Sequence, residues 1–259
     1  KGIATVTRQK YLTASEKGPW ANSYDRWRND NLTNRYQGVQ FGYTSAGRYT
    51  SWNDIWNYYG FKERDVLPGD YKYEDWNGDG EINGQDEHPF AFDQTPWLQF
   101  SLNAGLQWKN FDFNMLLQGS ALGSMEYKEP LHEIWGKNGG GALTHFLDRW
   151  HPVDPKADPY DPSTVWTSGH YAYTGRWAKN NSAFNRVSTA YLRLKSIELG
   201  YTFPKLKQIP NASLRVYANA YNLLTFTGVK FVDPEHPDDD LGRMYPLNKT
   251  YTLGVSLSF

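Results

Sequence analysis

The last ten residues alternate between apolar side chains and small or polar ones. Odd positions from Tyr251 to Phe259 are apolar, and even positions from Thr250 to Ser258 carry Thr, Gly or Ser. A strand of about ten residues with this alternation is typical of a transmembrane β-barrel wall, whose apolar side faces lipid and whose other side faces a wet lumen. A strand of a soluble β-sandwich also alternates, so this segment alone leaves both architectures open.

The same alternation predicts a hairpin over 98–118. Apolar residues occupy the even positions of 98–108, Lys109-Asn110 is expected to form a tight turn, and the alternation resumes at Phe111. Leu116 interrupts the second strand of this hairpin. Trp108 and Phe111 flank the turn, where a barrel is expected to carry an aromatic girdle.

Further strands are expected on both sides of this hairpin. A second hairpin is predicted at about 188–224, with a short link at 204–212 where Pro204 ends the first strand. Earlier strands are expected near 38–50 and in 1–13.

Short and long connections alternate along the chain. The turns at 109–110 and 204–212 are short, whereas the connections at about 51–97, 121–186 and 225–247 are long. Transmembrane barrels have short periplasmic turns and long extracellular loops. We therefore predict an all-β fold, a transmembrane antiparallel β-barrel with long extracellular loops, one of them at about 121–186. The chain would be either a small barrel with outsized loops or the C-terminal part of a larger one.

Composition narrows the classes of protein further. The mean hydropathy is -0.74 and no run of 18 apolar residues occurs, so helical membrane spans are not expected. Aromatic residues make up 17%, with 11 Trp and 19 Tyr, which suits interfacial girdles or surfaces that stack on ligands. The net charge of -1 predicts no nucleic-acid partner. Cysteine is absent, so a metal site would need oxygen or imidazole ligands.

A candidate calcium loop lies within 51–97. Calcium prefers six to eight oxygen ligands, and twelve-residue loops supply them from positions 1, 3, 5, 7, 9 and 12, with Gly at position 6 for the sharp turn. Here Gly80 occupies position 6, and position 7 would contribute its main-chain carbonyl. We predict a structural Ca²⁺ that rigidifies this connection; the alternative is a metal-free turn. The candidate ligands are Asp75, Asn77, Asp79, Glu81, Asn83 and Asp86.

No catalytic motif stands out. His132-Glu133 lacks the second His of a zinc-protease motif, and no nucleophile elbow or phosphate loop occurs, so we do not expect an enzyme. The run Asp233–Asp240 is expected to be a solvated loop, with a cation site as the alternative. Three tryptophans of the longest connection could stack on a ligand or pack the loop against itself: Trp135, Trp150 and Trp166.

The C-terminal half of the chain resembles a known family. The segment Ala190–Pro204, with the sequence AYLRLKSIELGYTFP, is similar to a signature of SusC/RagA-type TonB-dependent outer-membrane transporters. Arg215-Val-Tyr followed by Asn222-Leu-Leu-Thr, then Asp233-Pro-Glu and Tyr245-Pro, continue the resemblance in order. The similarity covers about residues 38 to 259.

The resemblance implies a role for the whole chain. Residues 1–259 would form the C-terminal part, roughly the last third, of a 22-stranded barrel, with the plug domain expected to lie outside this sequence. Any secretion signal would also lie outside it, because the sequence starts at Lys1 without one. Such transporters reside in the outer membrane of Gram-negative bacteria and import oligosaccharides or peptides. They work with a SusD-like surface lipoprotein and with the TonB complex, which acts through the plug.

In a barrel the polar faces of the strands would line the lumen. Their side chains offer hydrogen bonds and stacking to a polar substrate, whether or not each one touches it. The candidates are Gln99, Asn103, Gln107, Asn114, Gln118, Arg215, Tyr217, Asn219 and Tyr221. The rival interpretation is a soluble, extracellular, calcium-stabilised β-sandwich that binds or cleaves glycans. The two differ in what covers the apolar faces, which is lipid in a barrel and a second protein layer in a sandwich.

Overall fold

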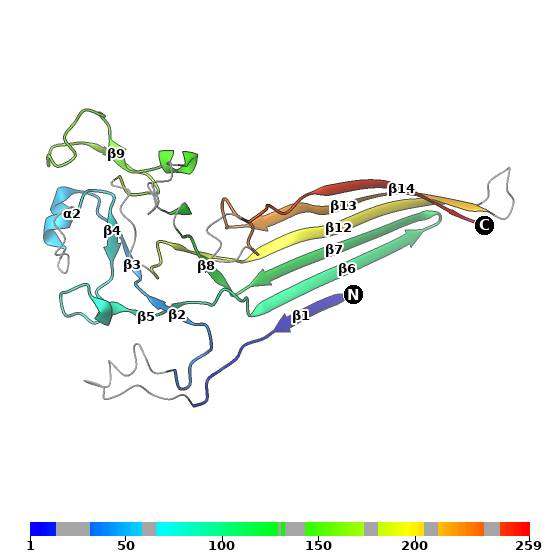
Figure 1. Cartoon of the computed structure of the whole chain (residues 1–259), viewed down its shortest axis with the longest axis horizontal. Helices are drawn as coiled ribbons and strands as arrows, with labels where there is room; N and C mark the ends of the chain where they lie inside the picture. The colour runs from blue at the N-terminus through cyan, green and yellow to red at the C-terminus, as the bar shows by residue number, and fades with distance from the viewer. Residues whose placement is uncertain are drawn as a thin grey trace.

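The computed structural model describes residues 1–13, 32–58, 66–128, 131–132, 143–173, 181–204, 212–235 and 244–259. Its main feature is one six-stranded antiparallel sheet, with the strand order β1-β6-β7-β12-β13-β14 (Figure 1). We call this sheet the wall. Its strands are β1 (Gly2–Val6), β6 (Leu98–Trp108), β7 (Phe111–Ala121), β12 (Tyr191–Phe203), β13 (Ser213–Thr227) and β14 (Thr250–Ser258).

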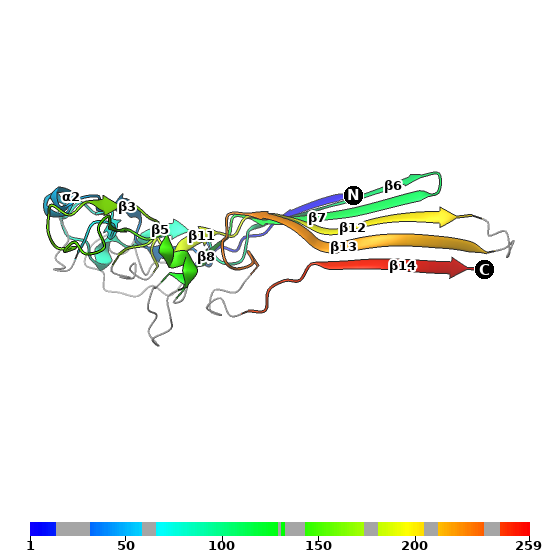
Figure 2. The same ribbon diagram turned by 90° about the horizontal axis from the view of Figure 1, so that it is seen from above.

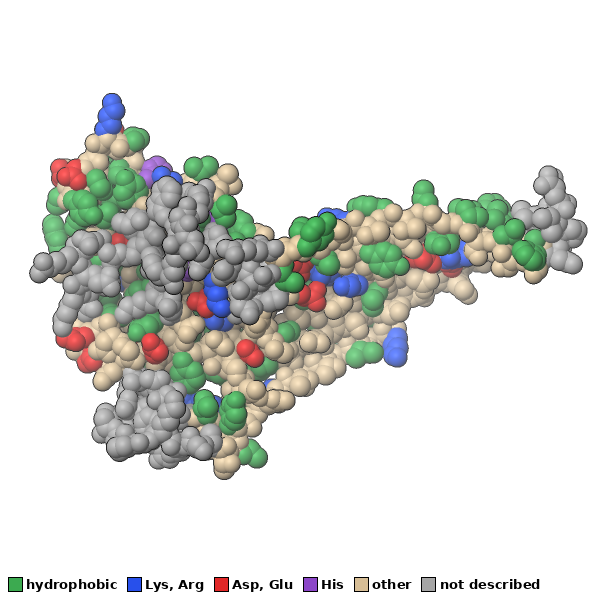
Figure 3. Space-filling model, viewed as in Figure 1, with side chains coloured by type: hydrophobic (Ala, Val, Ile, Leu, Met, Phe, Trp, Pro, Cys, Tyr) green, Lys and Arg blue, Asp and Glu red, His purple; other side chains and the backbone are tan. Residues whose placement is uncertain are grey.

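The wall has one apolar and one polar face. Leu253 pairs with Ala218, Ala218 with Leu199, and Leu199 in turn with Phe113, so the apolar positions of neighbouring strands coincide. Leu253 is 84% exposed and Leu106 is 64% exposed. No second layer covers this face within the described ranges (Figure 2). A space-filling view shows apolar side chains spread along the wall (Figure 3). The structure thus gives no support to the sandwich interpretation.

A bulge keeps the two faces in phase across the wall. Between the pairs formed by Leu194 and Ser196, β12 carries one residue, Lys195, that β7 does not match, and β13 carries two. One of those two, Asn222, adopts a left-handed φ of 52°. The bulge moves the apolar residues of β12 from even positions before it to odd positions after it, so that both sets face the same side.

Aromatic side chains gather where β6 and β7 meet at their turn. Lys109 adopts a left-handed φ of 54° there, which closes the predicted hairpin. Phe111 and Tyr201 contact edge to face with ring centroids 4.7 Å apart, and Trp108 stacks on Phe111. The Lys109 ammonium lies 5.1 Å from the Trp108 ring. This is the arrangement expected of an interfacial girdle.

The long connections assemble into a second body at the opposite end of the wall from this turn (Figures 1 and 2). We call it the loop body. It holds the helix α2 (Trp52–Asn57) and four short antiparallel strand pairs. The paired strands are β2 (Gln40–Gly42) with β5 (His88–Ala91), β3 (Ser45–Arg48) with β4 (Tyr71–Tyr73), β11 (Arg186–Ser188) with β8 (Ser124–Glu126), and β10 (Trp166–Thr167) with β9 (His151–Pro152).

Strand structure near 38–50 is confirmed, but it takes the form of two short strands and lies outside the wall. That segment forms β2 and β3, which pair inside the loop body and not in the wall. As a result, the connection between the wall strands β1 and β6 runs over 7–97 and is longer than the expected 51–97. The strand expected in 1–13 does join the wall, as β1 paired with β6.

The first two long connections together form the core of the loop body. Tyr43, Tyr71 and Tyr73 of the first connection surround Ala172 of the second, and Phe184 packs against the cluster. Ser182 pairs with Tyr43 in a parallel bridge. No helix in the described part of the chain is long and apolar enough to cross a membrane.

Candidate functional site

A charged network lies on the polar face near the turn end of the wall. Arg215 of β13 forms ion pairs with Asp112 of β7 and with Glu198 of β12, the latter at 2.7 Å. Strand β12 lies between Arg215 and Asp112, and the two meet because Gly200 separates them. A Cβ added at Gly200 would lie 2.5 Å from Asp112 Oδ1 and 2.6 Å from Arg215 Nη2. Both ion-pair partners of Arg215 therefore belong to the wall.

Two further lumen candidates are also engaged within the wall. A Cβ added at Gly254 would lie 2.2 Å from Tyr217 Cζ, so the tyrosine ring lies over this glycine of β14. Arg215 stacks on the same ring, with its Cζ 4.8 Å from the centroid. Asn219 Nδ2 donates to Glu198 Oε2 at 3.4 Å.

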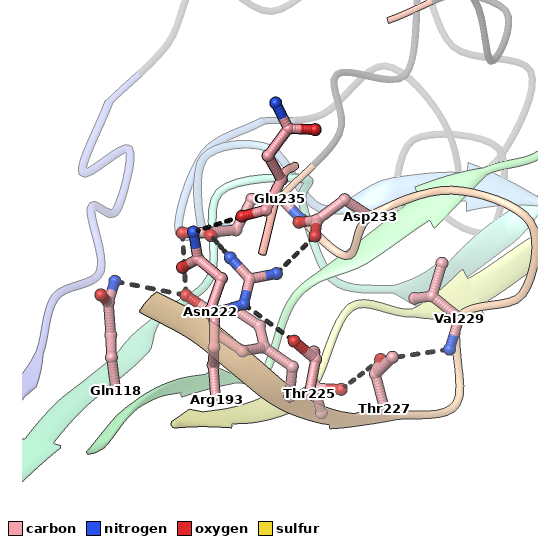
Figure 4. Close-up of polar contacts among 11 residues, drawn as sticks. Gln118, Arg193, Asn222, Thr225, Thr227, Val229, Asp233 and Glu235 are labelled. Carbon is pink, nitrogen blue, oxygen red and sulfur yellow. Dashed lines mark hydrogen bonds and ion pairs between the residues drawn. The ribbon is translucent and has the colours of Figure 1, made fainter. Parts of the chain in front are cut away.

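A second network lies at the loop end of the polar face and centres on Arg193 (Figure 4). The Arg193 side chain is fully buried. Its Nε donates to Thr225 Oγ1 at 3.0 Å, and its two terminal nitrogens donate to Asp233 and Glu235 at 2.5 Å each. Tyr191 Oη also donates to Glu235, at 2.8 Å. These contacts tie the segment after β13 to the face of β12.

The acidic segment is thus not simply a solvated loop. Asp233 and Glu235, its two described carboxylates, bind the guanidinium of Arg193. The rest of the run, 236–240, lies outside the described residues. The sequence contained one usable signal, since an arginine within an alternating strand needs a carboxylate partner once it is buried.

Next to this second network the polar face is hollowed into a concavity of about 570 Å³. It lies between β1, β6, β7, the start of β12 and the Arg193-bound segment. Its lining includes Gln99, Ser101, Gln118, Ser120, Tyr191 and Glu235, with Ile3 and Leu116 as apolar members. Leu116 interrupts the alternation of β7 because it faces this polar side, opposite Asn103 of β6.

Of the predicted lumen residues, Gln99 and Gln118 line the concavity. Asn103 and Gln107 are exposed farther along β6, and Tyr221 is 44% exposed on β13. The structure therefore distributes these candidates along the face without bringing them to one point. Three lining residues absent from the predicted set are Ser120, Tyr191 and Glu235.

The tryptophan candidates belong to the loop body. Trp150 packs over Gly69, where an added Cβ would lie 2.3 Å from Trp150 Cγ. Trp166 contacts Tyr173 edge to face at 5.4 Å. Both contacts pack the loop body against itself. Trp135 lies outside the residues that the structure describes.

The candidate calcium loop closes on itself through its predicted ligands. Asp75 accepts hydrogen bonds from Gly78 N at 2.8 Å and Gly80 N at 2.9 Å, and both glycines have positive φ, 73° and 83°. Asp79 Oδ1 accepts from Glu81 N at 2.8 Å. Asn77 Oδ1 accepts from Asp79 N at 2.8 Å. The side-chain oxygens thus turn into the loop.

Asp86 closes the far end of this loop. It is fully buried, with Oδ1 accepting from Trp76 N at 3.0 Å and Oδ2 from Asn83 N at 2.8 Å. Oδ1 also accepts from Asn77 N at 3.4 Å, which uses its second lone pair, so Oδ2 is the oxygen that keeps room for a cation. Within the described ranges, however, no three His, Cys, Asp or Glu side chains converge closely enough to hold a metal. Two of the predicted ligands contact each other directly, since Asn77 Nδ2 donates to Asp79 Oδ2 at 2.9 Å.

Burial lowers the pKa of three histidines of the loop body: His132, His145 and His170. Burial lowers the pKa of His132 to about 4. Burial also lowers the pKa of His170, the nearby Arg48 lowers it further, and Asp148 opposes this. His145 stacks on Phe231, with ring centroids 4.3 Å apart, so it joins the longest connection to the segment after β13.

Comparison with known proteins agrees with this architecture. No family model matches the chain. The TonB-dependent receptor P3 of Formosa agariphila is 28% identical over 211 residues, which is 75% of this chain and 19% of that receptor. The TonB-dependent receptor SusC of Bacteroides thetaiotaomicron is 26% identical over 210 residues, which is 80% of this chain and 19% of SusC.

Solved structures of a transporter share the fold. The RagAB peptide transporter matches with a TM-score of 0.54 at 21% identity, over 85% of this chain and 22% of the transporter chain. The RagAB peptide importer in its open-open state matches with a TM-score of 0.56 at 19% identity, over 96% of this chain and 25% of that chain. The present chain thus spans about a fifth of the length of these relatives. It is a relative of the SusC/RagA-type TonB-dependent receptors and has the fold of a segment of their antiparallel β-barrel wall.

Proposed function

We propose that this chain is the C-terminal wall segment of an outer-membrane transporter that imports oligosaccharides or peptides. The apolar face of the wall contacts lipid, and the polar face lines the path of the substrate. Import is passage through the lumen and breaks no bond in the substrate. A SusD-like lipoprotein delivers the substrate at the loop body, and the TonB complex supplies energy through a plug.

One observation carries this proposal: the wall sorts its side chains by face over six strands. The apolar face exposes large side chains, and its positions on the paired strands carry no charged or amide group. Exposed apolar surface on this scale is costly in water and favourable in hydrocarbon. The polar face holds the charged networks of Arg193 and Arg215.

An arginine placed on each face in turn tests the membrane assignment. Leu102 lies in the middle of β6 on the apolar face, and its neighbour Asn103 lies on the polar face. In the full-length transporter folded into phospholipid vesicles, Leu102→Arg is expected to lower the free energy of unfolding by about 2–4 kcal/mol. Asn103→Arg, the matched control, is expected to cost less than about 1 kcal/mol because a lumen side chain stays hydrated.

Urea titrations of the two variants measure both values. Equal costs for Leu102→Arg and Asn103→Arg would refute a lipid-facing position for Leu102. A tolerated Leu253→Arg on β14 would contradict the assignment in the same way. The lipoprotein partner is tested separately by affinity purification of the full-length transporter from its native membrane, with the partner expected to co-purify.

We also propose that the loop Asp75–Asp86 binds a structural Ca²⁺. The side chains of Asp75, Asn77 and Asp79, the Glu81 carbonyl, Asn83 and Asp86 would hold the ion. In support, the side-chain oxygens turn into the loop and its two positive-φ glycines allow the sharp turns. The ion would displace the hydrogen bond between Asn77 and Asp79 and neutralise the repulsion among the carboxylates.

Terbium luminescence tests this site, because Tb³⁺ occupies calcium sites and Trp76 lies within the loop to sensitise it. Terbium emission that Ca²⁺ competes away is expected from the full-length protein. Asp79→Asn is expected to weaken binding at least 10-fold, since it removes a charged ligand. Glu81→Gln is expected to leave binding unchanged, because position 7 contributes its main-chain carbonyl. Equal losses in the two variants would argue against this ligand set.

A further inference from the structure

The concavity at the loop end of the polar face has the size of a ligand site. Its volume of about 570 Å³ lies within the 300–1,000 Å³ typical of small-molecule pockets. Its floor is the face of β6 and β7, and the Arg193-bound segment closes one side with Pro234 and Glu235. Because that segment is tied down by Arg193, this side of the concavity is preformed.

The floor presents a lattice of uncharged hydrogen-bonding groups. Gln99 of β6 lies opposite Ser120 of β7, and Ser101 lies opposite Gln118. The side chains of Gln99, Ser101 and Ser120 have no hydrogen-bond partner among the described residues. Gln118 uses only its Nε2, which donates to Tyr191 Oη at 3.4 Å. Amides and hydroxyls both donate and accept, so this lattice matches a ligand whose groups also do both.

The charge of the lining argues against an anionic ligand. Neither lysine nor arginine lines the concavity within the described part of the chain, and its one carboxylate is Glu235. Arg193 faces both Asp233 and Glu235, so one cation meets two carboxylates and a negative charge remains. A carboxylated or sulfated ligand would be repelled. A cation would have to compete with Arg193 and Tyr191 for Glu235.

The lining also favours hydroxyl groups over a peptide main chain. Extended peptides are usually captured by the free backbone groups of a sheet edge. Strands β6 and β7 are paired on both sides, so their ladder groups are already used and only side chains face the concavity. Ile3 and Leu116 add apolar surface next to the polar lattice, which suits a ligand with both C–H and O–H groups.

We propose that this concavity is a lumenal subsite for one unit of an uncharged saccharide, held by Gln99, Ser101, Gln118 and Ser120. The subsite discriminates against acidic saccharides through Glu235. This assignment rests on the proposed import function and adds a substrate class and a location to it.

Glutamine-to-leucine variants of the full-length transporter test the subsite. Binding is measured by calorimetry with neutral gluco-, manno-, xylo- and galacto-hexasaccharides, hexagalacturonate and a hexapeptide pool. At least one neutral hexasaccharide is expected to bind, and hexagalacturonate is expected to bind more weakly. Gln99→Leu and Gln118→Leu are each expected to weaken binding of that neutral probe about five-fold, as for one lost hydrogen bond. Thr252→Val, on the polar face of β14 and outside the lining of the concavity, is the control and is expected to bind normally.

The outcomes separate this proposal from the import function. Normal binding by both Gln99→Leu and Gln118→Leu, or an equal loss in Thr252→Val, overturns the subsite. Binding of only the hexapeptide pool or hexagalacturonate overturns the saccharide assignment but leaves import standing. Binding of no probe also overturns the subsite, whereas import is then judged by the Leu102→Arg and Asn103→Arg comparison, which needs no substrate.

Discussion

Replacement of Arg193 by methionine should release the segment after β13 from the wall. Methionine keeps the unbranched apolar stem of arginine but removes the guanidinium, which donates to Thr225, Asp233 and Glu235. Two carboxylates then face each other without the cation between them. The expected result is local opening of 228–235 while the six-stranded sheet stays folded.

The size of the effect follows from burial. Loss of one partner of a fully buried ion pair costs about 3–5 kcal/mol, whereas an exposed pair contributes about 0–1 kcal/mol. Arg193 is fully buried, but Asp233 and Glu235 are 27% and 44% exposed, so water recovers part of the cost. We expect about 2–3 kcal/mol, which corresponds to roughly 30- to 150-fold more frequent opening.

Hydrogen–deuterium exchange of the full-length protein measures this opening, because amide exchange reports the free energy of local unfolding. Arg215→Met is the matched control, since Arg215 pairs only within the wall and should leave exchange in 228–235 unchanged. Unchanged exchange of this segment in Arg193→Met would refute the anchoring role. So would equal acceleration in Arg215→Met, which would indicate a general loss of stability.

Two further predictions concern the wall and the loop body. Gly200→Ala should break the contact between Asp112 and Arg215 and lower the free energy of unfolding by about 1 kcal/mol, measured by thermal unfolding. Gly105→Ala on the same face should cost less, because its Cβ would lie 3.0 Å from the nearest atom, compared with 2.5 Å at Gly200. In the loop body, the low pKa of His132 means that the unfolded state binds the extra proton first, so stability is complete above about pH 6.5 and falls as the pH drops towards 4. At 1.36 kcal/mol per pKa unit, the shift from 6.5 to about 4 limits the loss to about 3.4 kcal/mol. Limited proteolysis across this pH range should show the loss, and a His132→Asn variant with the same pH dependence would contradict the assignment.

Features that depend on neighbours in the sequence could be predicted from the sequence. The alternation of 98–108 and 250–259 determines which side chains share a face, because successive residues of a strand point to opposite sides. The hairpin turn at Lys109-Asn110 and the closure of Asp75–Asp86 on itself are equally local. The segment 38–50 shows the limit of such predictions, because alternation predicts a strand but not the strand with which it pairs.

Features that depend on distant partners appeared only in the tertiary structure. Arg193 binds carboxylates 40 and 42 residues away, and Arg215 binds one 103 residues away. The bulge at Lys195 becomes visible only when β12 is set against β7 and β13. Sequence alone determined the strands and their two faces, because these follow from local backbone geometry. The tertiary structure decided which strands pair, how the long connections pack together and where the polar face is hollow, because each of these depends on contacts between segments far apart in the chain.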